Sequence, residues 1–283
     1  MLKSDSTEST IPFLALLVLL VFVPLPFGSI PFWAQAFLTF CVFALLAAWA
    51  VNPYPNPFVL SQSKDHQDSF HQSDKSANRS LHGLLIVWSL ATAFAFLQVV
   101  PLPPSIIAVL SPALHELYGW TLPGYGPGGF WRALSTTPAS TIQSGLLIGA
   151  CGSAFFLVAR LCRSRERILA VAVTVVVVGL VEAIYGLTQG GGSLTKSVVT
   201  GTYVNYNHFA ALLSMSLGVN VGLLFTIWQA KTIDDLLTLR LDRWVYAVPL
   251  VIACLTILAG IMFSFSRMGL AAPILMLILF GGV

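Results

Sequence analysis

Long apolar runs separated by short polar segments fill almost the whole chain. Each run is close to the ~20 mostly apolar residues that an α-helix needs to cross the hydrocarbon core of a bilayer. The runs do not alternate apolar and polar positions as a β-barrel strand would, so we expect helices. The pattern predicts about eight membrane-spanning helices. They cover residues 11–27, 31–51, 82–100, 143–160, 168–189, 208–229, 244–263 and 268–283.

The composition agrees with this prediction, because 57% of the residues are hydrophobic, 9% are charged and the mean hydropathy is +0.85. Soluble domains carry about 25% charged residues. We therefore expect an all-α polytopic membrane protein, with residues 1–283 forming a single integral-membrane domain in contact with membrane lipids. No soluble domain fits between the spans, and no nucleic-acid partner is predicted.

The Lys and Arg residues indicate how the chain is oriented in the membrane. The sequence RLCRSRER at residues 160–167 places four arginines between two predicted spans, and short basic loops of this kind face the cytoplasm. Alternating outward from it puts the N-terminus, segment 52–81 and segment 230–243 inside, with eleven of the fourteen basic residues. Segment 52–81 is largely polar and of mixed charge, so we expect a flexible cytoplasmic loop. The basic residues left outside are Arg132, Lys196 and Arg267.

The first and last apolar runs bear on the extent of the chain. The first run follows Lys3, but Asp5 and Glu8 dilute the positive charge and Pro24 interrupts its end, so we expect a retained span rather than a signal peptide. The last run reaches Val283 without a polar flank. We therefore expect the chain to be the N-terminal part of a longer protein.

The predicted outer (periplasmic) loop at residues 101–142 is long and contains many proline and aromatic residues, among them Trp120 and Trp131. Such residues commonly anchor a segment at the membrane surface. A second interpretation makes the loop a wall of a cleft for a lipid substrate, with Arg132 facing an anionic group. The sequence leaves both interpretations open.

One carboxylic acid, Glu182, lies inside a predicted span, about two turns before the outer end of the fifth helix. A carboxyl group at this depth is costly unless it faces the protein interior or a wet cavity, which makes Glu182 a functional candidate. Tyr185 and Gln189 follow at i+3 and i+7 on the same helical face. The alternative is a structural hydrogen-bonded network between helices. Gln189 is the better functional candidate because it lies at the surface.

The segment GTYVNYNHFA, at residues 201–210, precedes the sixth predicted span on the outer side. Asn205 or Asn207 could cap this helix, since Asn is a preferred N-cap residue. Two asparagines, two tyrosines and a histidine exceed what one cap needs, and amides beside aromatic rings suit recognition of a sugar or a diphosphate. Helix N-termini also attract anions through free N–H groups. The candidate binding residues are Tyr203, Asn205, Asn207 and His208.

The segment FSFSRMG, at residues 263–269, stands in the same relation to the last predicted span. Ser264 and Ser266 are possible caps. Arg267 could extend along the helix to reach lipid headgroups. A guanidinium beside hydroxyl groups at an outer helix end also suits bidentate binding of a substrate phosphate. Ser266 and Arg267 are therefore added to the candidate site.

No metal site is predicted. His66 and His71 lie in the polar loop, but no cysteine or carboxylate cluster accompanies them at the spacing of metal ligands. The residues therefore give no support for a bound metal cofactor.

These residues together resemble those of the O-antigen ligase and polymerase family, membrane glycosyltransferases of the bacterial inner membrane that use glycans carried on polyprenyl diphosphate. The resemblance covers nearly the whole chain, and its last two motifs are the most specific. Tyr206 stands where the family usually has an arginine, and Met268 separates Arg267 from Gly269. The motifs are PLPFGSIPFWAQA, LQVVPLPPSIIAVLSP, VEAIYGLTQ, GTYVNYNHFAALL and FSFSRMGLAA.

The resemblance implies that Arg267 binds the donor diphosphate at the periplasmic face, and that Asn205, Asn207 and His208 line the same cavity with Gln189 nearby. It also implies about twelve spans in the complete protein and a large outer loop beyond Val283 that supplies the catalytic base.

The implied reaction is inverting transfer of a glycan from polyprenyl diphosphate to an acceptor hydroxyl, without a metal. The acceptor could be a growing glycan, a lipid A core or a protein hydroxyl, as in a protein O-oligosaccharyltransferase of the same scaffold. A polytopic transporter or lipid-glycan flippase is the competing class, although the candidate polar residues collect on one membrane face rather than at the midplane. An inactive structural subunit is a third interpretation.

Overall fold

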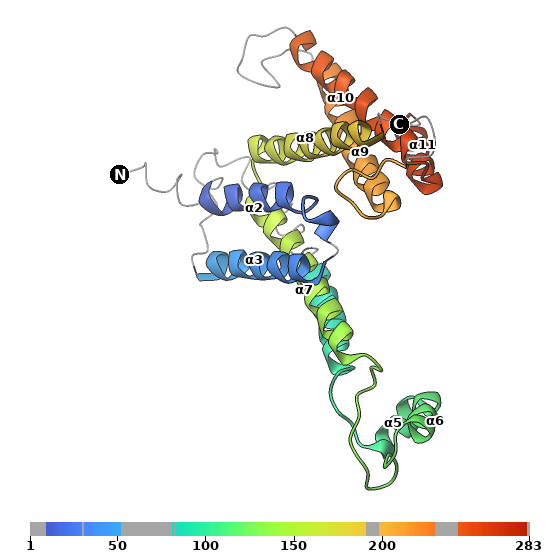
Figure 1. Cartoon of the computed structure of the whole chain (residues 1–283). Coiled ribbons are helices and arrows are strands. Elements are labelled where there is room, and N and C mark those ends of the chain that lie inside the picture. The colour runs from blue at the N-terminus through green and yellow to red at the C-terminus, as the bar shows by residue number, and fades with distance from the viewer. Residues whose placement is uncertain are drawn as a thin grey trace. The chain divides into compact units, whose positions relative to one another are not determined.

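The computed structural model describes residues 10–29, 31–51, 81, 83–190, 198–229 and 243–281 (Figure 1). Within these ranges the regular elements are helices, and the only β-type pairing is an isolated bridge between Leu102 and Arg132. The chain divides into two compact units, Met1–Leu38 with Arg160–Val283, and Thr39–Ala159. The labelled helices are α2 (Thr10–Phe22), η1 (Phe27–Ser29), α3 (Phe32–Val51), α5 (Pro104–Leu110), α6 (Pro112–Thr121), α7 (Pro138–Leu161), α8 (Arg165–Gly190), α9 (Tyr206–Gln229), α10 (Arg243–Phe263) and α11 (Arg267–Gly281).

Five helices of the described part are long and apolar enough to cross a membrane. This confirms the prediction of an all-α polytopic membrane protein, whereas the number of eight spans and the cytoplasmic N-terminus stay predictions. The other three predicted spans coincide with shorter helices, namely α2, Gly83–Leu97 and α11. The five long helices are Phe32–Val51, Pro138–Leu161, Arg165–Gln189, Tyr206–Trp228 and Trp244–Phe263.

Two helix ends differ from the predicted bounds by five residues each, more than the other ends do. The first apolar run was expected to stay helical to residue 27, but α2 ends at Phe22, because Pro24 and Pro26 follow and proline supplies no backbone N–H for a continuing helix. Helix α7 begins at Pro138, five residues before the predicted span at 143. Proline is favoured in the first turn of a helix, where its missing N–H is not needed.

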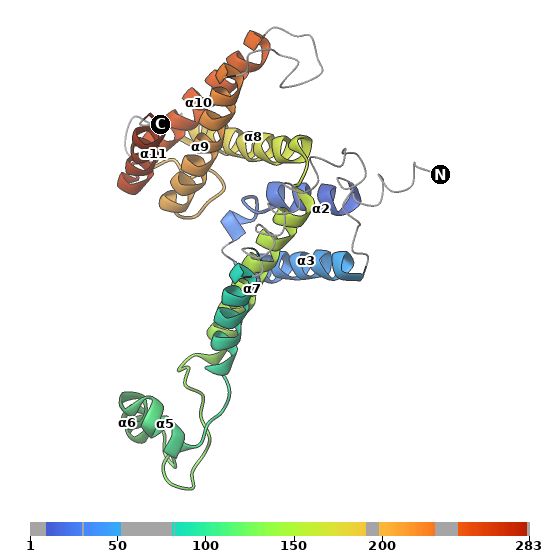
Figure 2. The same ribbon diagram turned by 180° about the vertical axis from the view of Figure 1, so that it is seen from behind.

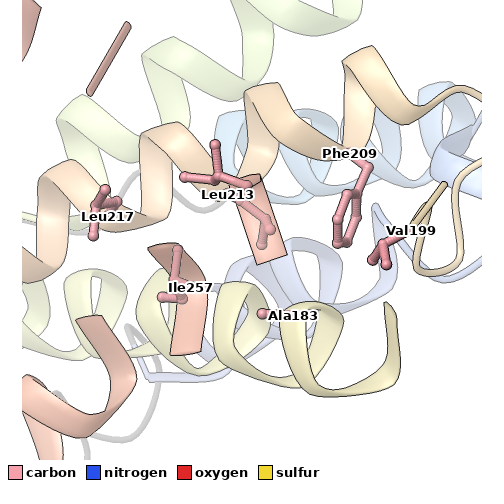
Figure 3. Close-up of a cluster of buried hydrophobic side chains, with 7 residues drawn as sticks. Ala183, Val199, Phe209, Leu213, Leu217 and Ile257 are labelled. Atoms are coloured by element: carbon pink, nitrogen blue, oxygen red, sulfur yellow. The ribbon is translucent and has the colours of Figure 1, made fainter. Parts of the chain in front are cut away.

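In the first unit, α8, α9, α10 and α11 lie together in both views (Figures 1 and 2). Their core contains side chains from three of these helices and from the segment before α9 (Figure 3). Small residues let the helices approach closely, since a Cβ on Gly260 would lie 2.8 Å from Leu213. The core residues are Ala183, Val199, Phe209, Leu213, Leu217, Ile257 and Ile261.

Buried polar side chains link the same helices. Ser216 on α9 donates to the carbonyl oxygen of Val175 on α8 at 3.2 Å, and Asn220 on α9 donates to that of Leu250 on α10 at 3.1 Å. Ser216 and Asn220 are fully buried. A hydrogen bond between membrane helices is worth about 1 kcal/mol, so these contacts fix helix pairing rather than dominate stability.

The second unit holds Gly83–Leu97, α5, α6 and most of α3 and α7. The indole N–H of Trp88 donates to the carbonyl oxygen of Ile148, which joins Gly83–Leu97 to α7. The predicted outer loop, residues 101–142, contains two short helices, α5 and α6. The hydroxyl of Tyr118 on α6 donates to the carbonyl oxygen of Ala133 at 3.0 Å, which closes the segment onto itself.

Candidate functional site

The first turns of α9 and α11 are each capped by a side chain just before the helix. The Asn205 Oδ1 accepts a hydrogen bond from the Asn207 N–H at 2.8 Å, and the Ser266 Oγ accepts one from the Gly269 N–H at 3.1 Å. Both bonds satisfy N–H groups that have no partner within their helix. The sequence left Asn205 or Asn207, and Ser264 or Ser266, as possible caps, and the hydrogen bonds give this role to Asn205 and Ser266.

A hydrogen bond joins the starts of the two helices. The Ser266 hydroxyl lies 2.9 Å from Oδ1 of Asn207, although the two residues are 59 positions apart in the sequence. Close backbone approach makes this possible, since a Cβ on Gly269 would lie 2.5 Å from that of Ala210. Ser266 is 1% exposed whereas Asn207 is exposed, so the bond lies at the edge of the protein interior. Asn207 therefore links α9 to α11 and does not cap its own helix.

Around this junction the polar side chains are exposed. Asn205, Asn207 and His208 lie on the surface at the start of α9, and Arg267 is the exposed first residue of α11. Two helix N-termini and one guanidinium make this surface positive. The described residues of the first unit include two glutamates, Glu166 at the start of α8 and Glu182, which is hydrogen-bonded to Thr202. The junction of Asn205, Asn207, His208, Ser266 and Arg267 is called the capped junction below.

A second polar group holds the turn at residues 201–203. The Thr202 N–H donates to Glu182 Oε2 at 3.0 Å, and the Thr202 Oγ1 lies 2.8 Å from Glu182 Oε1. Gly201 has a φ of 58° and its surroundings leave no room for a Cβ, which explains a glycine here. Gln189 reinforces the turn, since its Nε2 donates to the Gly201 carbonyl oxygen at 2.9 Å.

Tyr203 packs its ring against Gly28, in the segment that follows α2. A side chain on Gly28 would collide with this ring, and Gly28 has a φ of 65°. Burial raises the pKa of the Tyr203 phenol to about 12, and the nearby Glu182 adds to the shift when it is ionised. The phenol therefore stays protonated at neutral pH.

The predicted residues thus fall into two groups in the first unit. The capped junction holds one group, and the turn at residues 201–203 joins Glu182, Gln189 and Tyr203. Tyr185, predicted on the same helical face, is largely exposed. These contacts favour the structural network as the role of Glu182, while the binding roles themselves stay predictions.

One other candidate, Arg132, lies elsewhere. Arg132 belongs to the second unit, where its side chain is exposed and its backbone pairs with Leu102 at 2.8 and 3.0 Å. Its predicted contact with an anionic group stays a prediction. His66 and His71 lie outside the described residues. The described ranges contain no group of three His, Cys, Asp or Glu residues that could hold a metal ion, and metal independence also stays a prediction.

Sequence reasoning missed Thr202 and the backbone of Pro24 and Gly28. Their contacts join positions nearly two hundred residues apart, which no local pattern reveals. The one available signal was glycine next to an aromatic or polar cluster, at Gly201 and Gly28, where a close approach or a positive φ excludes other residues.

Comparisons of this chain with models of protein families, with curated proteins and with solved structures find no match. The resemblance to the O-antigen ligase and polymerase family therefore stands on the motifs alone.

Proposed function

We propose that this protein is a membrane glycosyltransferase that moves a glycan from polyprenyl diphosphate to an acceptor hydroxyl at the periplasmic face of the bacterial inner membrane. The capped junction is the observation that carries the proposal. It combines two helix N-termini, exposed amides and the guanidinium of Arg267 on one surface. A diphosphate attached to a lipid is an anion that such a surface would bind at the edge of the membrane.

In this proposal Arg267 holds the donor diphosphate through two parallel hydrogen bonds. When the bond between the sugar and the diphosphate breaks, negative charge grows on the leaving diphosphate. A positive group fixed before the reaction stabilises that charge without having to reorganise, and such a group is worth roughly 10² to 10³ in rate. Asn205, Asn207 and His208 would contact the sugar or the phosphate oxygens beside it. The acceptor would be a growing glycan, a lipid A core or a protein hydroxyl.

The competing transporter or flippase would use polar groups near the membrane midplane. Ser216 and Asn220 are polar and lie well inside α9. Each donates to the backbone of a neighbouring helix, so helix packing accounts for both donors, while Asn220 Oδ1 has no hydrogen-bond partner among the described residues. The exposed residues of the capped junction lie at the first turns of α9 and α11, which favours an enzyme with a donor held in the membrane.

The first test replaces Arg267 in cells whose surface glycan depends on this protein. We expect Arg267→Lys to lose roughly 100-fold in glycan transfer, nearly as much as Arg267→Ala, because one ammonium cannot replace a bidentate guanidinium. Arg165 is the matched control, since it is the exposed first residue of another helix, α8. Arg165→Lys should leave transfer unchanged. Normal surface glycan in the Arg267→Lys strain would refute the diphosphate role.

The second test separates helix capping from recognition. Asn205→Ala removes a cap worth ~1 kcal/mol, and a residue that only caps should lower the protein level without lowering activity per molecule. Asn207→Ala removes the link to Ser266 instead. We expect both variants to lose specific activity, measured as glycan transferred per molecule of protein in membranes. Unchanged specific activity in both variants would contradict a recognition role.

A further inference from the structure

The carboxyl group of Glu182 is the meeting point of three segments. It belongs to α8, it contacts Thr202 in the turn before α9, and through Thr202 it reaches the segment after α2. The Thr202 Oγ1 lies 2.8 Å from Glu182 Oε1 and 2.8 Å from the carbonyl oxygen of Pro24. Glu182 is 2% exposed, so these contacts lie inside the protein.

The number of protons in this group constrains what Glu182 does. A hydroxyl carries one proton, so Thr202 cannot make a full hydrogen bond to both oxygens, and the Pro24 carbonyl oxygen can only accept. When Thr202 donates to Pro24, the contact with Glu182 Oε1 needs a proton from the carboxyl group. The other oxygen, Oε2, then accepts from the Thr202 N–H at 3.0 Å. A carboxylic acid satisfies all three contacts, and a glutamine amide would satisfy them equally.

We propose that Glu182 is a positioning residue, which holds the turn at residues 201–203 through donated and accepted hydrogen bonds and not through a negative charge or contact with substrate. The turn leads into Asn205, three residues beyond Thr202, so the contact fixes where α9 begins. Gln189 and Gly28 hold the neighbouring residues Gly201 and Tyr203. The fixed turn therefore holds in place the segment that leads into the capped junction. The effect on donor binding rests on the proposed function, whereas the positioning of the turn does not.

Hydrogen exchange of the purified protein in lipid nanodiscs tests the positioning. Peptides that cover residues 198–208 report the Thr202 amide, which is protected by Glu182. We expect Glu182→Ala to speed exchange there roughly tenfold, the equivalent of one lost hydrogen bond. Glu182→Gln should stay within about twofold of the unsubstituted protein, because the amide restores every contact. Exchange in Glu182→Gln as fast as in Glu182→Ala would overturn the proposal.

Two threonine variants keep the test valid if Glu182→Ala does not fold. Thr202→Val keeps the side-chain shape and the backbone N–H but loses the hydroxyl. Hydrogen exchange at residues 198–208 should rise roughly fivefold. The rise is smaller than in Glu182→Ala because the N–H bond to Glu182 survives. Thr174→Val is the control, because the Thr174 hydroxyl bonds only within its own helix, to the carbonyl oxygen of Ala170 at 2.8 Å. It should leave exchange at residues 198–208 unchanged. Unchanged exchange in Thr202→Val would also overturn the proposal.

Binding of undecaprenyl diphosphate to the same nanodiscs separates this inference from the proposed function. If Glu182→Ala weakens binding and Glu182→Gln restores it, the turn positions the donor site. If the unsubstituted protein binds no donor while the exchange pattern holds, the proposed function fails and the positioning role of Glu182 stands. If Glu182→Gln keeps native exchange but loses donor binding, the carboxyl group has a direct role and the inference is wrong.

Discussion

The turn at residues 198–205 and the segment at residues 99–137 both combine aromatic, glycine and polar residues between apolar helices, yet their side chains lie in different surroundings. In the turn, Val199 and Gly201 are buried, and Phe209, which packs against Gly201, is 0% exposed. In the second segment the largest side chains point outward. Their exposed fractions are 84% for Trp120, 66% for Phe130 and 63% for Trp131.

The two regions also differ in how far their hydrogen bonds reach along the chain. The bonds of Ser266 to Asn207 and of Thr202 to Pro24 join residues 59 and 178 positions apart. In the second segment, Leu102 pairs with Arg132, Tyr118 bonds to Ala133 and His115 to Tyr125, at separations of 30, 15 and 10. A turn held by several distant elements keeps its side chains in one arrangement, as a binding site requires. A segment whose hydrogen bonds reach only residues within itself and at its two ends is better suited to offering an apolar surface.

The largest expected difference is between Phe209, an aromatic side chain of α9 that packs on the turn, and Phe130 in the second segment. Phe209→Ala should destabilise the protein by about 3 kcal/mol, because it leaves a cavity in the core. This is the lower end of the range for a buried phenylalanine, since the lipid around the unfolded helices is itself apolar and reduces the transfer free energy. Phe130→Ala is the matched control, and its cost should stay below about 0.5 kcal/mol. Equilibrium unfolding in lipid–detergent micelles measures both. Equal losses would show that the two regions are packed alike.

The comparison of the two regions separates the features that the sequence could predict from those that it could not. Apolar runs predicted the helices, and residue type narrowed the caps to Asn205 or Asn207 and to Ser264 or Ser266, because hydropathy and capping act within a few residues. The pairing of Asn207 with Ser266 depends on how α9 meets α11, which no local pattern encodes. The exposure of Phe130 and the burial of Phe209 could not be told apart for the same reason, since both follow polar or glycine-rich stretches.

Two glycines with a left-handed backbone provide a second comparison, with a smaller expected effect. Gly201 and Gly128 have φ values of 58° and 80°, but a Cβ would lie 2.5 Å from Glu182 at the first and would meet nothing within 4 Å at the second. Gly128→Ala should therefore cost about 1 kcal/mol, for the backbone alone. Gly201→Ala adds overpacking, for a total of about 3 kcal/mol. Similar unfolding midpoints for the two variants would mean that the turn yields to the added methyl.

The smallest expected difference concerns two serines that each precede a helix. Ser266 caps α11 and bonds to Asn207, whereas Ser111 precedes α6 and its side chain makes no capping hydrogen bond. Ser266→Ala should cost about 1 to 2 kcal/mol, since it removes a cap and leaves Asn207 without this partner. Ser111→Ala should be neutral within about 0.5 kcal/mol in the same unfolding measurement. If Ser266→Ala were equally neutral, water would replace both of its bonds, and the junction of α9 with α11 would be too loose to hold a donor in one orientation.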